Sequence, residues 1–386
     1  MQVAVPNPQT GIQLTDEQQY VLDYLFKDRH HKRIQTMGGY AGVGKTLVLA
    51  HLIKRLEAER ENWAVCAFTG KATNQLRRKG VVGAKTIHSL IYIPKPSVED
   101  EWDPVTEKWV EVRHMGWEPQ DELDVTGIIV DEASMVSGSL CRDLESYGKP
   151  IIYVGDHGQL EPIGENPGLM DNPMYRLETI HRNAGEIAYF AEHLRKGYRA
   201  GDFHATDKVA FMSYADLNSN DEVLLGVDQI ICAFNRTRCE INQKVRQLLG
   251  KGDELLTIGE RIMCLRNNKE YGIFNGMQGV VTKIEWGRMV GDKAVPRITF
   301  QADDLVVENI NLDPDQFGRE KPLQKFGNDI EGLELFDYVY GATAHKCQGD
   351  QFDSVLVIEQ KCPYWTHSRW TYTAASRAVN GLVWVC

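Results

Sequence analysis

The chain has 386 residues, of which 42% are hydrophobic and 25% charged, and its formal net charge is −11. This length exceeds what a single hydrophobic core supports, and no apolar run approaches the roughly 20 residues of a membrane-spanning helix, nor does the N-terminus resemble a secretion signal. The acidic balance excludes a surface coated in positive potential, but it does not exclude nucleic acid, because a basic channel can lie within an acidic body.

A glycine-rich loop, GYAGVGKT at 39–46, lies between a segment that predicts a short buried strand and one with apolar residues at helical spacing. In this context a GxxxxGK[ST] loop binds phosphate, because its backbone N–H groups surround phosphate oxygens at a helix N-terminus. Lys45 is predicted to reach the β- and γ-phosphates of ATP, and the Thr46 hydroxyl to hold Mg²⁺. The alternative is a chance glycine turn with a surface lysine. The glycines predicted to bind the nucleotide are Gly39, Gly42 and Gly44.

A second segment, VTGIIVDEASMVS, is an apolar run that ends on two carboxylates, Asp131 and Glu132. Its Ile and Val residues predict a strand at the centre of a parallel sheet, and ligands bind at the carboxyl ends of such strands. Asp131 is predicted to hold Mg²⁺, and Glu132 to orient and deprotonate a water. A kinase would also need an acceptor hydroxyl, so the loop and the acid pair together predict an ATP hydrolase. The alternative is a solvated acidic strand end.

The next predicted strand, Ile151 to Val154, precedes the sequence GDHGQLEPIG. Gln159 in this sequence could hydrogen-bond the γ-phosphate or the attacking water and report cleavage to the rest of the protein. Taken alone, Gln159 is equally consistent with an ordinary loop amide.

An acidic insertion at 93–124 is predicted to form a β-hairpin around DPVTEK, with Trp102 and Trp109 flanking the turn. Between residues 97 and 124 there are ten Asp or Glu residues against one Lys and one Arg. Because like charges repel at short range, this segment is not expected to grip a phosphate backbone. The tryptophans either form the tip of a wedge or simply pack the hairpin onto its domain.

Nine motifs in order resemble the motif set of superfamily 1 helicases, and their forms are similar to the RecD-like and Dda-like branch, many of whose short members come from phages. The resemblance spans nearly the whole chain. The motifs are LTDEQ (14–18), GYAGVGKT (39–46), AFTGKATNQLR (67–77), KTIHSLI (85–91), VDEAS (130–134), VGDHGQLEPIG (154–164), IHRN (180–183), ATAHKCQG (342–349) and YTAASRA (372–378).

The resemblance implies further roles at the nucleotide. Gln18 matches the family's adenine reader, since an amide can donate and accept together. Arg182 and Arg377 match two arginines that reach the γ-phosphate from the second domain. In related phosphoryl transfers such an arginine raises turnover by roughly 10³- to 10⁵-fold. The implied catalytic residues are Lys45, Glu132, Gln159, Arg182 and Arg377.

The same resemblance implies contacts to a DNA strand. Hydroxyls, amides and lysines usually contact phosphate oxygens and carry no sequence information. The matched positions are Thr69, Lys71, Asn74, Thr86, His88, Asn235, Thr343, His345, Lys346 and Gln348. Capping and core-edge roles are the alternative for each, and Asn235 and Arg238 could face either DNA or nucleotide. Three residues depart from the family pattern, namely Glu161, Cys347 and Asp350. The acid at 350 puts in question how closely that loop approaches phosphate.

The implied fold is α/β, with two RecA-like parallel-sheet motor domains. Domain one covers 1–178 with the hairpin at 93–124 as a separation pin, and domain two combines 179–253 with 335–386. The intervening segment, 254–334, has short β-type runs broken by Asn-Gly and Gly turns and is expected to form an SH3-like barrel. ATP would draw the two motor domains together, and hydrolysis would reopen them.

The expected activity is that of an ATP- and Mg²⁺-dependent helicase that travels 5′→3′ on single-stranded DNA and unwinds duplexes in replication, recombination or repair. Expected partners are single-stranded DNA, its junctions with duplex, and replication or single-strand-binding proteins, with a monomeric chain and no membrane. Eight scattered cysteines predict reduced thiols and a cytoplasmic protein, in the host cytoplasm if viral. The alternatives are a nucleoprotein remodeller or RNA-directed motor that does not unwind, and a nucleotide-gated binding protein without turnover.

Overall fold

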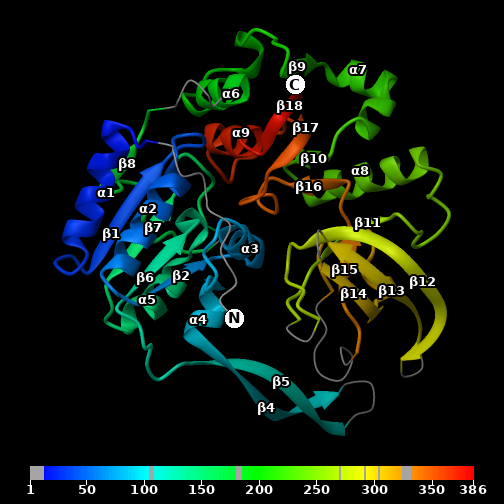
Figure 1. The fold of residues 1–386 in the computed structure, drawn as a ribbon. Coiled ribbons are helices and arrows are strands. Elements are labelled where there is room, and N and C mark those ends of the chain that lie inside the picture. Colours follow the sequence, from blue (N-terminus) through cyan, green and yellow to red (C-terminus); the bar gives the residue numbers. More distant parts are fainter. Residues whose placement is uncertain are drawn as a thin grey trace. The chain divides into compact units, whose positions relative to one another are not determined.

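The computed structural model describes most of the chain, and for residues 94–103 and 108–117 it describes the backbone (Figure 1). The described residues are 13–103, 108–162, 164–179, 185–268, 271–290, 293–302, 305–323 and 332–386. Contacts divide the chain into two units. The first contains Met1–Ile91, Asp121–Ser219 and Cys347–Cys386, and the second contains Tyr92–Gln120 and Asn220–Lys346.

The first unit is built on a six-stranded sheet in the order β3-β2-β6-β7-β1-β8, and every pair of neighbours in it is parallel. Its strands are β1 Ile34–Gly39, β2 Trp63–Ala67, β3 Lys85–Thr86, β6 Gly127–Asp131, β7 Ile151–Gly155 and β8 Tyr175–Leu177. Strand β6 lies inside the sheet between β2 and β7, which confirms the prediction made from its run of Ile and Val. The predicted α/β class is therefore confirmed.

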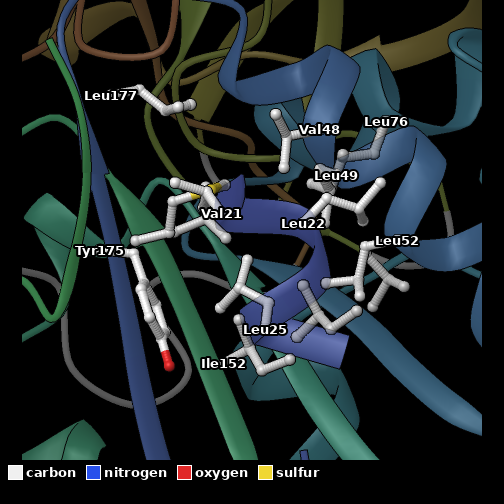
Figure 2. Close-up of a cluster of buried hydrophobic side chains, with 14 of the residues drawn as sticks. Val21, Leu22, Leu25, Val48, Leu49, Leu52, Leu76, Ile152, Tyr175 and Leu177 are labelled. Atoms are coloured by element: carbon white, nitrogen blue, oxygen red, sulfur yellow. The ribbon is translucent and has the colours of Figure 1, made fainter. Parts of the chain in front are cut away.

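Helices of the first unit bury apolar residues against this sheet. Figure 2 shows Leu22 and Leu25 of α1 beside Leu49 and Leu52 of α2, over Ile152 of β7. In α2 the buried side chains recur at helical spacing, as the sequence predicts, and they are Val48, Leu49, Leu52 and Leu56. The helices are α1 Asp16–Asp28, α2 Lys45–Ala58, α3 Gly70–Arg78, α4 Ile87–Ile91 and α5 Gly138–Ser146, and the 3-10 helix η1 is Ala133–Met135.

The first unit also contains a second set of parallel strands, in which β18 pairs with β17 and β9. Helix α9 contributes Trp370 and Tyr372, which are among the largest fully buried side chains of the described residues. These elements are α6 Gly185–Arg195, η3 Ala200–Asp202, β9 Val209–Met212, α7 Tyr214–Ser219, β17 Phe352–Ile358, α9 His367–Ala375 and β18 Ala378–Val385.

The second unit joins a parallel strand pair to an antiparallel sheet. Strand β10 Gln229–Cys232 pairs with β16 Gly341–Thr343, and helix α8 Asn235–Leu248 follows β10. Five strands form the antiparallel sheet, in the order β14-β13-β12-β11-β15. They are β11 Arg261–Cys264, β12 Gln278–Val290, β13 Lys293–Ala302, β14 Leu305–Asn311 and β15 Phe336–Tyr338, and the 3-10 helices are η4 Asp221–Leu225 and η5 Pro314–Gln316. Because β15 pairs with β11, this sheet extends beyond the boundary expected at residue 334.

The acidic insertion forms a two-stranded antiparallel hairpin of β4 Tyr92–Asp103 and β5 Lys108–Pro119. Its register places Trp102 directly opposite Trp109. The turn at 104–107 lies outside the described residues. Within the described part of the chain, no helix combines the length and apolar character that crossing a membrane requires.

Candidate functional site

The glycine-rich loop joins the end of β1 to the start of α2 in the first unit. Gly42 and Gly44 have left-handed backbones, with φ of 80° and 87°. A side chain at Gly44 would also collide with Gln18, since a Cβ there would lie 2.4 Å from its Nε2. The Nζ of Lys45 donates to the carbonyls of Gly39 at 2.7 Å and Tyr40 at 2.9 Å. The loop thus folds around the ammonium that is predicted to bind phosphate.

Gln18 holds this loop against α1. Its Nε2 donates to the carbonyl of Val43 at 2.9 Å, and its Oε1 accepts from the backbone N–H of Thr15 at 3.1 Å. The second bond belongs to a capping box that starts α1. Gln18 is only 2% exposed. Its predicted contact with adenine would therefore require an exchange of one of these bonds, and that role stays a prediction.

Two carboxylates lie together where β6 ends. The Oδ1 of Asp131 accepts from the backbone N–H of Glu132 at 2.9 Å. Glu132 has a φ of 54°, a left-handed conformation that side chains other than glycine adopt at a cost of roughly 1 kcal/mol or more. Burial raises the pKa of both carboxyls, and the charge of Asp131 raises the pKa of Glu132 further. The ammonium of Lys45 lowers both pKa values, so the loop lysine and the acid pair share one electrostatic environment.

A hydrogen-bonded group that the sequence did not suggest connects α9 to the loop. Asp156 is 1% exposed, and its Oδ2 accepts from the hydroxyl of Tyr372 at 2.7 Å. The same hydroxyl accepts from the backbone N–H of Ala41 at 2.7 Å. The Nζ of Lys45 lies 3.8 Å from the Oδ2 of Asp156. The only sequence signal was that Asp156 and Tyr372 each lie inside a recognisable motif.

Gln159 extends this group toward a small cavity. Its Nε2 donates to the Oδ2 of Asp156 at 3.2 Å. Its Oε1 is buried without a hydrogen-bond partner among the described residues, and the same holds for the Oγ of Ser134. Both residues line the cavity together with Asp156. Buried polar atoms are seldom left unpaired, so these two oxygens are suited to a water or a ligand.

The two predicted arginines have different outcomes. Arg182 lies outside the described residues. Arg377 is 4% exposed, and its guanidinium donates to the carbonyls of Thr373 at 3.0 Å and Asp350 at 3.1 Å and to the Oγ of Ser376 at 2.8 Å. Its charge lowers the pKa of Glu132, which places Arg377 near the acid pair.

A third arginine, which the sequence did not suggest, lies over the loop. The guanidinium carbon of Arg195 is 3.9 Å from the ring centroid of Tyr40, and two bonds of 2.6 Å attach the guanidinium to Glu192. His157 lies 4.1 Å from the same ring, and burial lowers its pKa to about 4. His157 is therefore neutral near pH 7.

Several residues of the first unit that are predicted to contact a DNA strand form hydrogen bonds within the protein. Thr69 caps α3 by accepting from the N–H of Ala72 at 3.1 Å, and Thr86 accepts from the N–H of Ser89 at 3.1 Å. The alternative capping role is thus present at both threonines. Asn74 accepts from Arg77 at 3.2 Å, His88 is exposed on α4, and the buried Gln348 donates to the carbonyl of Leu160 at 3.3 Å. Lys71 forms an ion pair with Asp350 at 2.7 Å.

The other residues that are predicted to contact a DNA strand lie in the second unit. Asn235 is exposed at the first turn of α8, whereas Arg238 is buried in an ion pair of 2.7 Å with Asp337. Thr343 is 7% exposed, and burial lowers the pKa of His345. The Nζ of Lys346 donates to the side chain of Asn275 at 3.1 Å. The sequence left open whether Asn235 and Arg238 face DNA or nucleotide, and of these two residues Asn235 is the exposed one.

The side chains present fit Mg²⁺. The described residues contain no group of three or more His, Cys, Asp or Glu side chains that could hold a metal ion. Mg²⁺ does not need such a group, because it takes one or two protein oxygens together with water and substrate phosphates. The Thr46 hydroxyl and the Asp131 carboxylate are oxygen ligands of this kind.

Comparisons with known proteins agree with this picture. Residues 13–215 match the family model described as the AAA domain. The chain is 26% identical over 401 residues to an ATP-dependent RecD2 DNA helicase of Deinococcus radiodurans, covering 95% of this chain and 48% of that protein. It is 28% identical over 205 residues to the ATP-dependent DNA helicase PIF1 of Trypanosoma brucei brucei, covering 48% of this chain and 19% of that protein. The chain thus spans about half or less of these relatives' lengths.

In structure, the chain is similar to Pif1 helicase from Bacteroides in complex with ADP-AlF3 and single-stranded DNA. The TM-score is 0.56 at 19% identity, and the match covers 97% of this chain and 92% of that one. This likeness shows a shared α/β fold.

Proposed function

The chain belongs to the AAA domain family, and from this premise we propose that it is an ATP-dependent DNA helicase. One observation carries the proposal. The loop lysine, the half-buried acid pair and Gln159, whose Oε1 has no hydrogen-bond partner among the described residues, form one site at the end of a parallel sheet. A protein that only bound nucleotide would not need the acid that follows β6, whose pKa burial raises. The names of the similar proteins support DNA as the substrate of the motor.

The residues of the site divide the work of ATP hydrolysis. Lys45 would leave the carbonyls of its own loop and bind the β- and γ-phosphates. Glu132 would accept a proton from the attacking water, which Gln159 would orient through its Oε1. Arg377 would stabilise charge that develops on the γ-phosphate. Mg²⁺, held by Thr46 and Asp131, would supply neutralising charge to the phosphates when bound.

The finer features of the proposal rest on the motif resemblance. We propose a superfamily 1 motor of the RecD-like branch and phage type, with two RecA-like domains and 5′→3′ travel. It would act as a monomer on single-stranded DNA and on junctions with duplex, in replication, recombination or repair. The host cytoplasm would be its location, and single-strand-binding or replication proteins would be its partners.

A strand-displacement assay tests the proposal directly. Duplexes carrying a 5′ or a 3′ single-stranded tail, in DNA and in RNA, are incubated with ATP and Mg²⁺ while ATP hydrolysis is measured in parallel. The proposal expects hydrolysis that DNA stimulates and displacement of the DNA duplex with the 5′ tail. DNA-stimulated hydrolysis without displacement on any substrate would instead indicate a remodeller, and preference for the RNA substrates would indicate an RNA-directed motor. Absence of hydrolysis would overturn the enzymatic assignment.

A further inference from the structure

An ion pair joins helix α3 to the loop that follows β16. The Nζ of Lys71, in the first turn of α3, lies 2.7 Å from the Oδ2 of Asp350. Asp350 is 2% exposed, whereas the side chain of Lys71 is 29% exposed. One turn along α3, the Nε2 of Gln75 donates to the carbonyl of Gly349 at 3.0 Å. We call these four residues, Lys71, Gln75, Gly349 and Asp350, the clasp.

In the clasp, Asp350 pairs with Lys71, which the motif resemblance predicts to contact a phosphate of the DNA strand. Lys71 can contact a phosphate oxygen only by exchanging the carboxylate of Asp350 for it. Burial raises the pKa of Asp350, which shows that the charged carboxylate is poorly solvated at this position. A buried carboxylate that loses its cationic partner is costly, so the pair competes with the strand for Lys71. The acid at 350, which departs from the family pattern, therefore weakens the hold of Lys71 on a DNA phosphate.

Asp350 also contacts Arg377, which is predicted to act at the γ-phosphate of ATP. Its backbone carbonyl accepts from the Nη1 of Arg377 at 3.1 Å. The guanidinium of Arg377 also donates to the carbonyl of Thr373 and to the Oγ of Ser376, and the motif resemblance assigns this arginine to the γ-phosphate. The side chain of one residue therefore holds a predicted strand contact, while its main chain holds a predicted catalytic arginine.

We propose that Asp350 is a positioning residue that couples strand binding to ATP hydrolysis through the clasp. Its carboxylate holds Lys71 while the strand is absent, and the loop then keeps Arg377 bonded to the carbonyl of Asp350. When a phosphate of the strand takes Lys71, the loop is released and Arg377 becomes available to the γ-phosphate. The proposal rests on the proposed function, and it adds the device by which DNA stimulates that function.

Binding of a labelled oligothymidylate, followed by fluorescence anisotropy, tests the first half. Asp350→Asn should tighten binding about fivefold, because the competing carboxylate is lost. In the background of Lys71→Gln the same change should have less than about a twofold effect, since the lysine that it frees is absent. Asp353→Asn, a nearby exposed acid on β17, is the matched control for loss of one negative charge and should leave affinity unchanged. Equal effects of Asp350→Asn with and without Lys71 would overturn the clasp.

ATP hydrolysis without DNA tests the second half. Asp350→Asn should raise the DNA-free rate about fivefold and lower the ratio of stimulated to unstimulated rates by a similar factor. Lys71→Gln also opens the clasp, so it should raise the DNA-free rate while it weakens DNA binding, and this variant serves if Asp350→Asn fails to fold. An unchanged DNA-free rate in both variants would overturn the coupling. A wild-type protein that neither binds DNA nor responds to it would instead overturn the proposed function.

Discussion

Glu132 is the residue on which the proposed chemistry depends most directly. It follows a buried strand, adopts a left-handed backbone conformation with φ of 54°, and lies beside a second carboxylate. Strain and like charge at one position cost stability, and such costs concentrate where a protein performs chemistry. Lys45 contrasts with it, because its ammonium is already satisfied by two carbonyls of its own loop.

The first prediction separates these two residues. Glu132→Gln should lower ATP turnover by about 10²- to 10⁴-fold, the usual contribution of a general base, and should leave nucleotide affinity intact. Lys45→Ala should also abolish turnover, but by weakening nucleotide binding. Turnover and binding of a fluorescent ATP analogue are measured on both variants, with Glu57→Gln on the exposed end of α2 as control. Substantial turnover by the Glu132→Gln protein would remove Glu132 as the base.

The second prediction concerns pH and stability at the same residue. The pKa of Glu132 in the folded state lies above its ordinary value of 4.5, so the folded protein holds this proton more tightly than the unfolded chain. The free energy of unfolding must therefore fall as pH rises from the ordinary value through the raised one. Gln at 132 has no such proton, so Glu132→Gln should stabilise the protein by about 1 kcal/mol at pH 7. The gain should shrink as the pH is lowered toward 4.5.

Thermal unfolding from pH 4 to pH 8 measures this difference between the wild type and the variant. Glu57→Gln, which removes a carboxylate at the exposed end of α2, is the control for the loss of one negative charge. A loss of stability in Glu132→Gln at pH 7 would show that the carboxylate is favourably placed in the fold and would contradict the raised pKa.

At the scale of elements, the sequence was sufficient where the signal is local. The run GIIVD predicts a central strand by itself, and the spacing of glycines in GYAGVGKT predicts a phosphate loop between a strand and a helix, as β1 and α2 show. Contacts between distant segments were not predictable. Nothing in the residues around Tyr372 reveals that its hydroxyl lies between Ala41 and Asp156, because sequence spacing carries no information on that distance.

Because contacts between distant segments cannot be read from sequence, some residues predicted to contact phosphate have other partners in the structure. Lys71 and Arg238 have the chemistry of phosphate contacts, and from sequence alone their partners Asp350 and Asp337 could not be identified. Thr69 has the chemistry of both a phosphate contact and a helix cap, and only the start of α3 decides that it caps.

The third prediction tests the link between α9 and the phosphate loop. Tyr372→Phe keeps the buried ring but removes the hydroxyl that bonds Ala41 and Asp156. Both partners then lack one bond, which should cost about 1 to 3 kcal/mol of stability. Chemical denaturation measures this loss, and Tyr364→Phe, whose side chain is 91% exposed, is the control. Equal stability of Tyr372→Phe and the wild type would mean that the hydroxyl contributes nothing to this link.

At the scale of the whole molecule, the described nucleotide-site residues and the hairpin belong to different units. Gln18, Lys45, the acid pair and Gln159 lie in the first unit, whereas β4 and β5 belong to the second. The hairpin can therefore be altered without changing any side chain of the nucleotide site. Its register pairs Glu101 with Val110, next to the pair of tryptophans. A two-residue Asn-Gly turn that joins these two positions would preserve every remaining strand pair.

The last prediction uses this shortened hairpin, in which Asn-Gly replaces residues 102–109. If the tryptophans or the turn form the wedge, single-stranded DNA should still stimulate ATP hydrolysis, because the predicted strand contacts lie elsewhere in the chain. Strand separation should fall steeply, since each base-pair step costs roughly 1.4 kcal/mol of stacking to open and nothing would oppose re-annealing.

A variant of unchanged length with Trp102→Tyr and Trp109→Tyr keeps two aromatic rings and should retain most of the unwinding. DNA-stimulated hydrolysis and strand displacement are measured side by side on each protein. If both activities of the shortened protein fall together, the hairpin is a packing element, and if its unwinding is unchanged, the wedge lies in another part of the chain.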